Sequence, residues 1–312
     1  MTKLVAAFAL AASLLVVPGP VRAQSPMGAF CGVRRVHPSR YDHVLWIWME
    51  NHSFGQIVGS SAAPFMNALI ANCGLATNYH NITHVSLPNY VGAVTGLALP
   101  DLLKFDLDCS PSATCSTNAP SIFAQVLSWK GYMESMLTNC QTTGFVGYAV
   151  RHNPPPYLSS LSGCSMFDVP YTDLQTDLDN DTLPAFAFVT PNSVHDMHDG
   201  PDPTAIQNGD TWLSTELPKI LNSAAYQARR MVVFVTFDEG AGGGIGEDCA
   251  ANPADESCHV VTIVVSPSTP RGATSGRPFT HYSLLRTAER LLRVRGLGQA
   301  RRARSMRHAF GL

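Results

Sequence analysis

The chain has 312 residues, of which 45% are hydrophobic and 14% charged, with a formal net charge of -2 and a pI near 6.6. This much apolar material can form the core of a large domain, so the composition excludes a globally disordered chain. The near-neutral charge argues against the basic stripe that neutralises nucleic-acid phosphates, so we expect no nucleic-acid partner.

The first 23 residues have the pattern of a removable signal peptide. Lys3 precedes an apolar run from Leu4 to Val17, which a Pro-Gly-Pro break and a Val-Arg-Ala cleavage site follow. The alternative is a membrane anchor, but that needs about 20 apolar residues and this run is shorter. We therefore expect cleavage near Ala23, secretion to the extracellular or periplasmic space, and no stable membrane span.

Eight cysteines lie after that cleavage site, and an even number suits disulfide bonding in an oxidising compartment. The chain has no Cys-x-x-Cys pair, so metal binding by thiolates is the weaker interpretation. The short spacings of Cys109/Cys115 and Cys249/Cys258 favour local loop bridges. Eight cysteines allow about 105 pairings, and spacing alone does not choose among them.

Four short runs rich in β-branched and aromatic residues have the composition of strands buried on both faces. They are His43 to Met49, Ala185 to Thr190, Met231 to Phe237 and Val260 to Ser266. Helical patterns of apolar residues occur at 63–73, 121–130, 211–229 and 281–294. The alternation predicts a layered α/β fold with a largely parallel sheet.

No linker or internal repeat interrupts this pattern, so we expect one domain over 41–295 and a basic C-terminal tail at 296–312. The basic cluster Arg-Gly-Leu-Gly-Gln-Ala-Arg-Arg-Ala-Arg-Ser-Met-Arg is read first as a solvated tail. Contact with a membrane surface or a polyanion is the alternative.

Ligands bind beyond the carboxyl ends of strands in open α/β sheets, so polar residues that follow a buried strand are the first candidates for a site. Glu50 and Asn51 follow the first strand, and Asp238 and Glu239 follow the third. Their oxygens suit a hard divalent cation, which would also relieve the repulsion between adjacent carboxylates. The alternatives are a turn or helix cap at Asn51 and a solvated acidic loop at 238–239.

A third polar segment, His195-Asp196-Met197-His198-Asp199, follows the second strand. Histidines and a carboxylate this close together could supply metal ligands, or a general acid or base whose tautomer a carboxylate sets. A polar surface loop is the alternative.

Ser86 lies in the segment Thr-His-Val-Ser-Leu-Pro-Asn-Tyr at 83–90. Pro88 suits a first helical turn, which would place Ser86 at or near the N-cap, where free N–H groups favour a phosphate oxyanion. A hydroxyl there could attack phosphorus, or it could simply cap the helix.

Together these segments supply a nucleophile, a metal site, anion-binding N–H groups and a proton donor, which are the parts of a phosphoryl-transfer site. The chain lacks the G-x-S-x-G elbow of α/β-hydrolases and the G-x-x-x-x-G-K-[ST] loop of nucleotide-using enzymes.

The motifs MENHSFGQIVG, THVSLPNYVGAVTG, TPNSVHDMHDG, VVFVTFDEG and THYSLLRTAERLL occur in this order, with APFMNAL and GDTWL between them. In this order they resemble the bacterial phosphoesterase family of secreted acid phosphatases and mycobacterial phosphatidylinositol-3-phosphate phosphatases, distantly related to phospholipase C. The resemblance covers residues 41–293. It implies an alkaline-phosphatase-like, three-layer α/β/α fold.

The resemblance also implies roles for individual residues. A divalent metal ion of open identity would be held by Glu50, Asn51, Ser86, Asp238 and Glu239. Ser86 would be the nucleophile that forms a phosphoserine intermediate, and Asn89 would contact phosphate. His198, with Asp196 beside it, would be the general acid. His84 and His281 fall in family motifs without a defined role.

Two departures from the family pattern are His195, where Asn is more usual, and Gly240, where a further acidic residue is usual. The implied function is a secreted, metal-dependent phosphate monoester hydrolase, with phosphoinositides among its candidate substrates and a phospholipid head group as a candidate partner. The alternatives are a phospholipase C-type phosphodiesterase and a secreted metal-binding module without catalysis. The sequence leaves the oligomeric state open.

Overall fold

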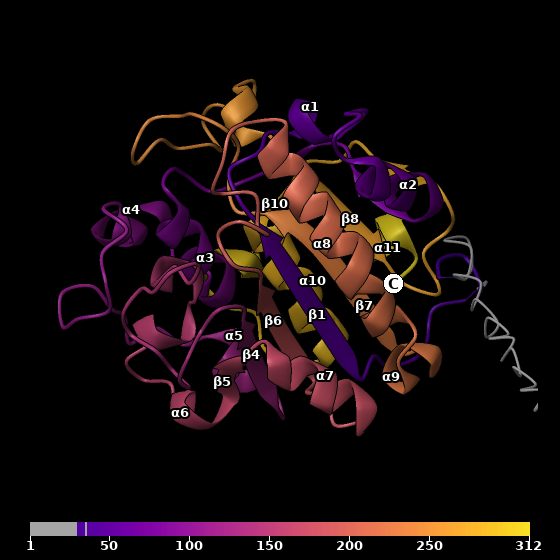
Figure 1. The fold of residues 1–312 in the computed structure, drawn as a ribbon, viewed down its shortest axis with the longest axis horizontal. Coiled ribbons are helices and arrows are strands. Elements are labelled where there is room, and N and C mark those ends of the chain that lie inside the picture. The colour runs from indigo at the N-terminus through magenta and orange to yellow at the C-terminus, as the bar shows by residue number, and fades with distance from the viewer. Residues whose placement is uncertain (1–29, 35) are drawn as a thin grey trace, which may run out of the picture.

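The computed structural model describes residues 30–34 and 36–312, so the expected signal peptide lies outside the described residues. Eight strands form one sheet in the order β5-β4-β6-β1-β7-β8-β2-β9, and β10 pairs with β3 apart from it (Figure 1). The strands are β1 (His43–Met49), β2 (Gly74–Ala76), β3 (Tyr79–His80), β4 (Trp129–Met133), β5 (Asp168–Pro170), β6 (Phe186–Thr190), β7 (Met231–Phe237), β8 (Thr262–Val265), β9 (Ala273–Ser275) and β10 (Phe279–Thr280).

The centre of the sheet is parallel, as predicted. β1 lies between β6 and β7 and runs parallel to both, with Trp46 opposite Phe188 on one side and Phe234 on the other. β4 and β5 continue the parallel arrangement. Every residue of β6 and β7 is buried, which explains why these strands are continuous apolar runs.

The fourth predicted strand is present as β8, but it runs antiparallel to β7. A parallel return would need a crossover to the other end of the sheet. The connection from Asp238 to Val261 instead consists of loops and one short 3₁₀ turn, so the chain re-enters the sheet at the end where it left it.

Helices cover both faces of the sheet, which confirms the three-layer α/β/α architecture. In Figure 1, α8 (Thr204–Leu221) lies in front of the sheet alongside β1, and α10 (His281–Leu292) lies behind β1. α2 (Pro64–Asn72) and α7 (Thr172–Asp179) contact α8, whereas α3 (Ser86–Thr95) packs on α10. The shorter helices are α1 (Phe54–Ile57), α4 (Leu99–Leu102), α5 (Ile122–Gln125), α6 (Cys164–Phe167), α9 (Ala224–Gln227) and α11 (Arg307–Phe310).

The helix expected over 121–130 is wrong. Only α5 is helical there, and β4 begins at Trp129 and pairs with β6. The Trp129 ring packs on Phe123, with ring centroids 4.8 Å apart. Short apolar runs do not distinguish helix from strand by periodicity, and here pairing with β6 decided the outcome.

Four disulfides join Cys31 to Cys73, Cys109 to Cys115, Cys140 to Cys164 and Cys249 to Cys258. Both local pairs favoured by the sequence are therefore confirmed. Within 30–34 and 36–312, no helix has the length and apolar character needed to cross a membrane.

The start of α2 is capped by a residue of another helix. The residue before α2 is Ala63, whose side chain offers no cap. Instead the buried Asp210 of α8 accepts hydrogen bonds from Phe65 N at 2.9 Å and Met66 N at 2.8 Å. One carboxylate thus satisfies two free N–H groups and ties the two helices together.

We expect Asp210→Ala to lower the free energy of unfolding by about 1–2 kcal/mol, because both N–H groups lose their partner. Asp210→Asn keeps one acceptor oxygen and should cost less. Urea unfolding of the three proteins measures the difference. Equal stability of wild type and Asp210→Ala would show that the cap is unimportant.

Candidate functional site

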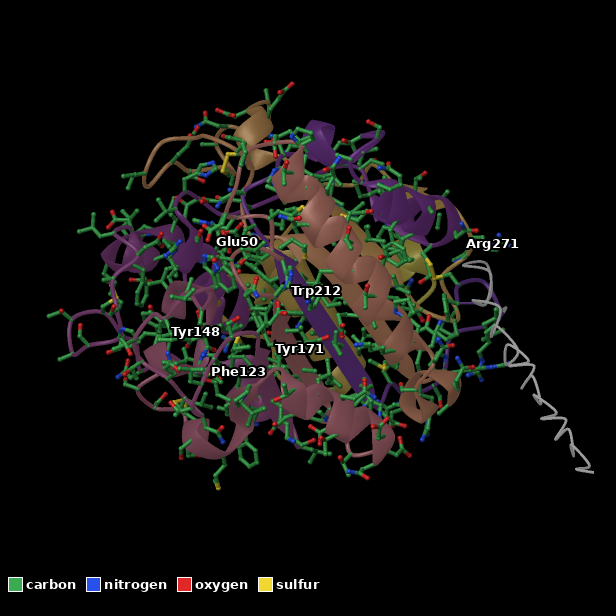
Figure 2. The ribbon with its side chains drawn as sticks, in the orientation of Figure 1. Glu50, Phe123, Tyr148, Tyr171, Trp212 and Arg271 are labelled. Atoms are coloured by element: carbon green, nitrogen blue, oxygen red, sulfur yellow. A yellow bond between two sulfur atoms is a disulfide. The ribbon has the colours of Figure 1, made fainter. Side chains whose placement is uncertain are left out.

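The segments that follow β1, β6 and β7 meet at one edge of the sheet. Glu50 N donates to Asp196 O at 2.8 Å, and Asp238 N donates to Met49 O at 3.0 Å. The cause is the strand order, because the carboxyl ends of adjacent parallel strands lie at the same edge. Figure 2 shows Glu50 at this end of β1.

Glu50 is fully buried and lies against α3. Ser86 Oγ donates to Glu50 Oε2 at 3.1 Å, and Tyr90 OH donates to Glu50 Oε1 at 2.5 Å. Ser86 and Tyr90 are one helical turn apart, so they present their hydroxyls on the same face of α3. Burial and the nearby carboxylates of Asp238 and Asp196 raise the pKa of Glu50 well above its usual range.

Asp238 is also fully buried, and burial raises its pKa to about 7. Its Oδ1 accepts a hydrogen bond from Asn51 N at 3.1 Å, whereas Oδ2 has no partner. Asn51 makes this contact from a left-handed backbone conformation, with φ at 56°, which Asn tolerates better than most residues.

Glu239 is held by His84, whose Nδ1 lies 2.7 Å from Glu239 Oε2. The other ring nitrogen, Nε2, lies 3.8 and 3.9 Å from the sulfurs of Cys249 and Cys258. The loop at 239–249, which contains Gly243, covers the ring so closely that a Cβ at this glycine would lie 2.3 Å from it. His84 is therefore enclosed between Glu239 and the disulfide.

These residues fit a divalent metal ion. Glu50, Asp196, Asp238 and Glu239 bury four carboxylates together, and buried charges need pairing or a metal. The unpartnered Oδ2 of Asp238 is an acceptor without a donor. Carboxylates, an amide oxygen and a hydroxyl are the ligands of hard cations.

His152 is a site residue that the sequence reasoning missed. Its Nδ1 lies 3.1 Å from Asp196 Oδ2, and its Nε2 lies 3.3 Å from Glu50 Oε1 without forming a hydrogen bond. Ligating atoms of Glu50, His152 and His198 lie within 4.8 Å of one another, so His152 could also hold a cation. It lies shortly before three prolines in a segment for which we predicted no site residue, and a histidine in a proline-rich loop was the available signal.

His198 lies at the rim of the same cluster. Its backbone N donates to Asp196 Oδ1 at 2.8 Å, and its Nδ1 lies 2.8 Å from Asp199 Oδ1. Arg151 Nη2 lies 2.8 Å from His198 Nε2. Because a guanidinium only donates, Nε2 accepts this hydrogen bond and carries no proton here. The ring proton is therefore on Nδ1, which donates a hydrogen bond to Asp199.

A cleft of about 500 Å³ opens beside Arg151 and Asp199, the two residues that contact the His198 ring. It is lined by Asp108, Phe145, Tyr148, Arg151, Ser193 and Asp199, among others. Arg151 Nε lies 3.5 Å from Asp108 Oδ2, and the other oxygen of Asp108 accepts from Leu87 N at 2.9 Å. We expected the N–H groups at the start of α3 to face an anion. The N–H of Leu87 instead forms its hydrogen bond with Asp108.

We expected Asn89 to contact phosphate. Its side chain is buried and forms all of its hydrogen bonds with the backbone of the loop that leads to Ser86. Its Oδ1 accepts from Ile82 N and Thr83 N, and its Nδ2 donates to Thr83 O and Val85 O. The amide group has no hydrogen-bonding capacity left for a ligand. Its contacts fix the loop leading into α3.

His281, which had no defined role, and His195, which departs from the family pattern, differ in position. His281 is buried under the site, where Nε2 donates to Asp238 O at 2.6 Å and Nδ1 accepts from Tyr79 OH at 3.0 Å. Burial lowers the pKa of His281 to about 4, so it is neutral and supports the end of β7. His195 turns away to Glu134, with Nδ1 2.9 Å from Oε2.

Comparison with known proteins shows which family the chain resembles. The model of the phosphoesterase family matches residues 60–295. A phosphatidylinositol-3-phosphatase of Mycobacterium tuberculosis is 28% identical over 279 residues, which cover 87% of this chain and 83% of that protein. An acid phosphatase of Aspergillus fumigatus is 27% identical over 81% of this chain, which spans only 55% of that longer protein.

Solved structures show the same fold. A protein of the alkaline phosphatase superfamily from Vibrio parahaemolyticus aligns with a TM-score of 0.54 and 12% identity, covering 86% of this chain and 69% of that one. Murine ectonucleotide pyrophosphatase/phosphodiesterase 5 gives 0.55 and 12%, covering 82% and 96%. The alkaline-phosphatase-like fold expected from the sequence is therefore confirmed, and with most of its length matched by the family model, the chain belongs to the phosphoesterase family and is a phosphoric ester hydrolase.

Proposed function

We propose that the protein is a secreted, metal-dependent phosphate monoester hydrolase with Ser86 as its nucleophile. The observation that carries the proposal is the hydrogen bond of 3.1 Å from Ser86 Oγ to Glu50 Oε2, inside a cluster of buried carboxylates. A hydroxyl aimed into such a cluster has an acceptor for its proton and a place for a cation beside it. The phosphatase names of the matched relatives support monoesters as substrates.

A divalent ion held by Glu50, Asn51, Asp238 and Glu239 would lower the pKa of the attacking hydroxyl and neutralise charge on the phosphoryl oxygens. Ser86 Oγ forms a bond to phosphorus as the bond to the leaving oxygen breaks. The hydroxyl proton of Ser86 passes to a carboxylate, and Glu50 is the carboxylate that already accepts its hydrogen bond. Water then hydrolyses the phosphoserine and restores Ser86.

Arg151 and His198 would act on the substrate together. Arg151 is a cation at the cleft, and its planar fork matches two phosphate oxygens. When phosphate takes the Arg151 donors, His198 Nε2 loses its hydrogen-bond donor and can carry a proton. Since Asp199 holds Nδ1, His198 would then deliver that proton to the leaving oxygen.

Secretion is supported by the cysteines. All eight are paired in the described part of the chain, which leaves no free thiol. Such complete pairing is typical of proteins in an oxidising compartment.

We expect Ser86→Ala to lower kcat on an aryl phosphate by at least about a thousandfold, because the covalent step loses its nucleophile. Ser121→Ala, which changes a buried serine at the start of α5, is the matched control and should retain activity. Both are assayed with and without chelator, on a phosphate monoester and a choline phosphodiester. Activity of Ser86→Ala near that of the wild type would refute the assignment, and preference for the diester would favour a phospholipase C-type enzyme.

The contact of His84 with Glu239 predicts an effect on metal affinity. His84→Ala leaves Glu239 without its partner, and we expect metal affinity to fall by about tenfold to a hundredfold, as for other groups that orient ligands. His84→Asn places an amide N–H near the position of Nδ1 and should therefore retain most of the metal affinity of the wild type. Isothermal titration with the metal ion measures both. Equal affinity of wild type and His84→Ala would contradict the role.

The raised pKa of Asp238 predicts how stability depends on pH. The folded protein without metal keeps this carboxyl protonated up to about pH 7, whereas its ordinary value is 3.8. Between these values the folded state binds more protons than the unfolded state, so this contribution to stability is lost as pH rises.

We therefore expect chelator-treated protein to melt at a lower temperature at about pH 8 than at about pH 5. Added metal should raise the melting temperature more at the higher pH, since its ligands must be ionised. Asp238→Asn is the control and should reduce both differences. A melting temperature of the chelated wild type that rises with pH would contradict the prediction.

A further inference from the structure

A strongly basic feature lies outside the site described above. Residues 290–312 contain seven arginines and neither aspartate nor glutamate. The whole chain carries a formal charge of -2 and this segment +7, so the remainder carries -9. The molecule therefore concentrates positive charge in its last residues.

This segment is folded onto the domain. Ala300, Met306, Phe310 and Leu312 are buried. Gln299 N donates to Gly96 O at 2.7 Å, which joins the segment to the end of α3, and Met306 N donates to Thr287 Oγ1 of α10 at 2.8 Å. The arginines are thus presented on a fixed backbone.

The arginines lie in one short segment, from the last turn of α10 to the residues that follow it. Arg286 and Arg290 are one helical turn apart on α10, and Arg293 directly follows its last residue. A Cβ at Gly296 would lie 2.7 Å from Arg286 Nη1 and 3.0 Å from Arg301 Cγ, so these two side chains are neighbours. We call the exposed members the arginine surface: Arg290, Arg293, Arg295, Arg301, Arg302 and Arg304.

Among the described residues, none of these six arginines forms an ion pair. The ion pairs of arginines formed there involve Arg40, Arg151, Arg230 and Arg286. Arg293 and Arg301 donate only to the backbone carbonyls of Ser39 and Gly296. Six charges without an ion pair in one folded segment repel one another, and they create a positive potential for an outside anion.

The surface lies at the end of α10 remote from the site. α10 begins at His281, which contacts Asp238, and runs away from the carboxyl ends of the strands to Leu292. The arginine surface begins in the last turn of α10 and continues beyond it. An anionic partner bound there would leave the cleft at the other end open.

We propose that the arginine surface binds the face of a membrane that contains anionic phospholipids. A planar membrane surface would contact only the basic end of the molecule. A long polyanion wrapped around the domain would also contact the rest of the molecule, whose negative charge would repel it. Among the described residues no large hydrophobic side chain in 286–312 is exposed, so attraction is electrostatic and the protein is peripheral. Each arginine at such a surface strengthens binding about fivefold, equivalent to about 1 kcal/mol.

Co-sedimentation of the full mature protein with vesicles tests the proposal. Vesicles of phosphatidylcholine alone are compared with vesicles of phosphatidylcholine and phosphatidylglycerol, at low and high salt. The variant is R295Q/R302Q/R304Q, whose three side chains make no hydrogen bond among those described. The control is K104Q/K219Q/R277Q, which changes the net charge equally through exposed residues elsewhere.

We expect binding only to the anionic vesicles, weakening with salt as screening increases. The arginine variant should bind about a hundredfold more weakly, whereas the control should remain close to the wild type. Hydrolysis of a soluble aryl phosphate should be the same in all three proteins, because the surface lies away from the cleft. Absent vesicle binding, equal loss in both variants, equal binding to neutral vesicles, or retention only on a sulfated polysaccharide would each overturn the proposal.

Discussion

The structure depends on one constraint, which is the burial of several carboxylates where three parallel strands end. Glu50, Asp196 and Asp238 are fully buried, and Glu239 is nearly so. Carboxylates taken out of water must be protonated, hydrogen-bonded or paired with a cation. The raised pKa values of Glu50 and Asp238 express this cost. A divalent ion would relieve it, so the same charges that destabilise the metal-free protein suit the chemistry of phosphoryl transfer.

Hydrogen-bond donors around the cluster hold each of the three carboxylates Glu50, Asp196 and Asp238 through at least one oxygen. Asn51 N and His198 N donate to carboxylates from the backbone, while Ser86 and Tyr90 donate from one face of α3. Outside these contacts lies a further layer of support, formed by His281 with Tyr79, His84 with its disulfide, and Asn89 with its loop. Such support keeps a site in its reactive geometry without movement of the backbone.

The two ends of the molecule differ in charge for reasons that lie in the fold. The acidic residues follow the strands, because the carboxyl ends of a parallel sheet are where polar side chains can converge. The arginines follow α10, which carries the chain away from that edge to the opposite end. In the arrangement we propose, one end would hold the protein at an anionic surface and the other would remain open to substrate.

Local sequence was enough to identify much of this. Buried strands appear as continuous apolar runs, and Glu50, Asn51, Asp238 and Glu239 stand out because polar residues there have no packing purpose. The resemblance to the phosphoesterase family, confirmed by the family model, added an expectation for Ser86 and His198.

The tertiary structure decided what depends on residues distant in the sequence. The apolar run that contains the start of β4 suits a helix or a strand equally, and we predicted a helix there. Pairing with β6 selected the strand. His152 and Arg151 lie in a proline-rich loop whose sequence does not reveal that it folds against Glu50 and His198. Sequence by itself determined which strand ends are followed by polar side chains, because burial and polarity are local properties of a segment. Which side chains face one another was settled by strand order and loop packing, since those contacts join residues that no local pattern connects.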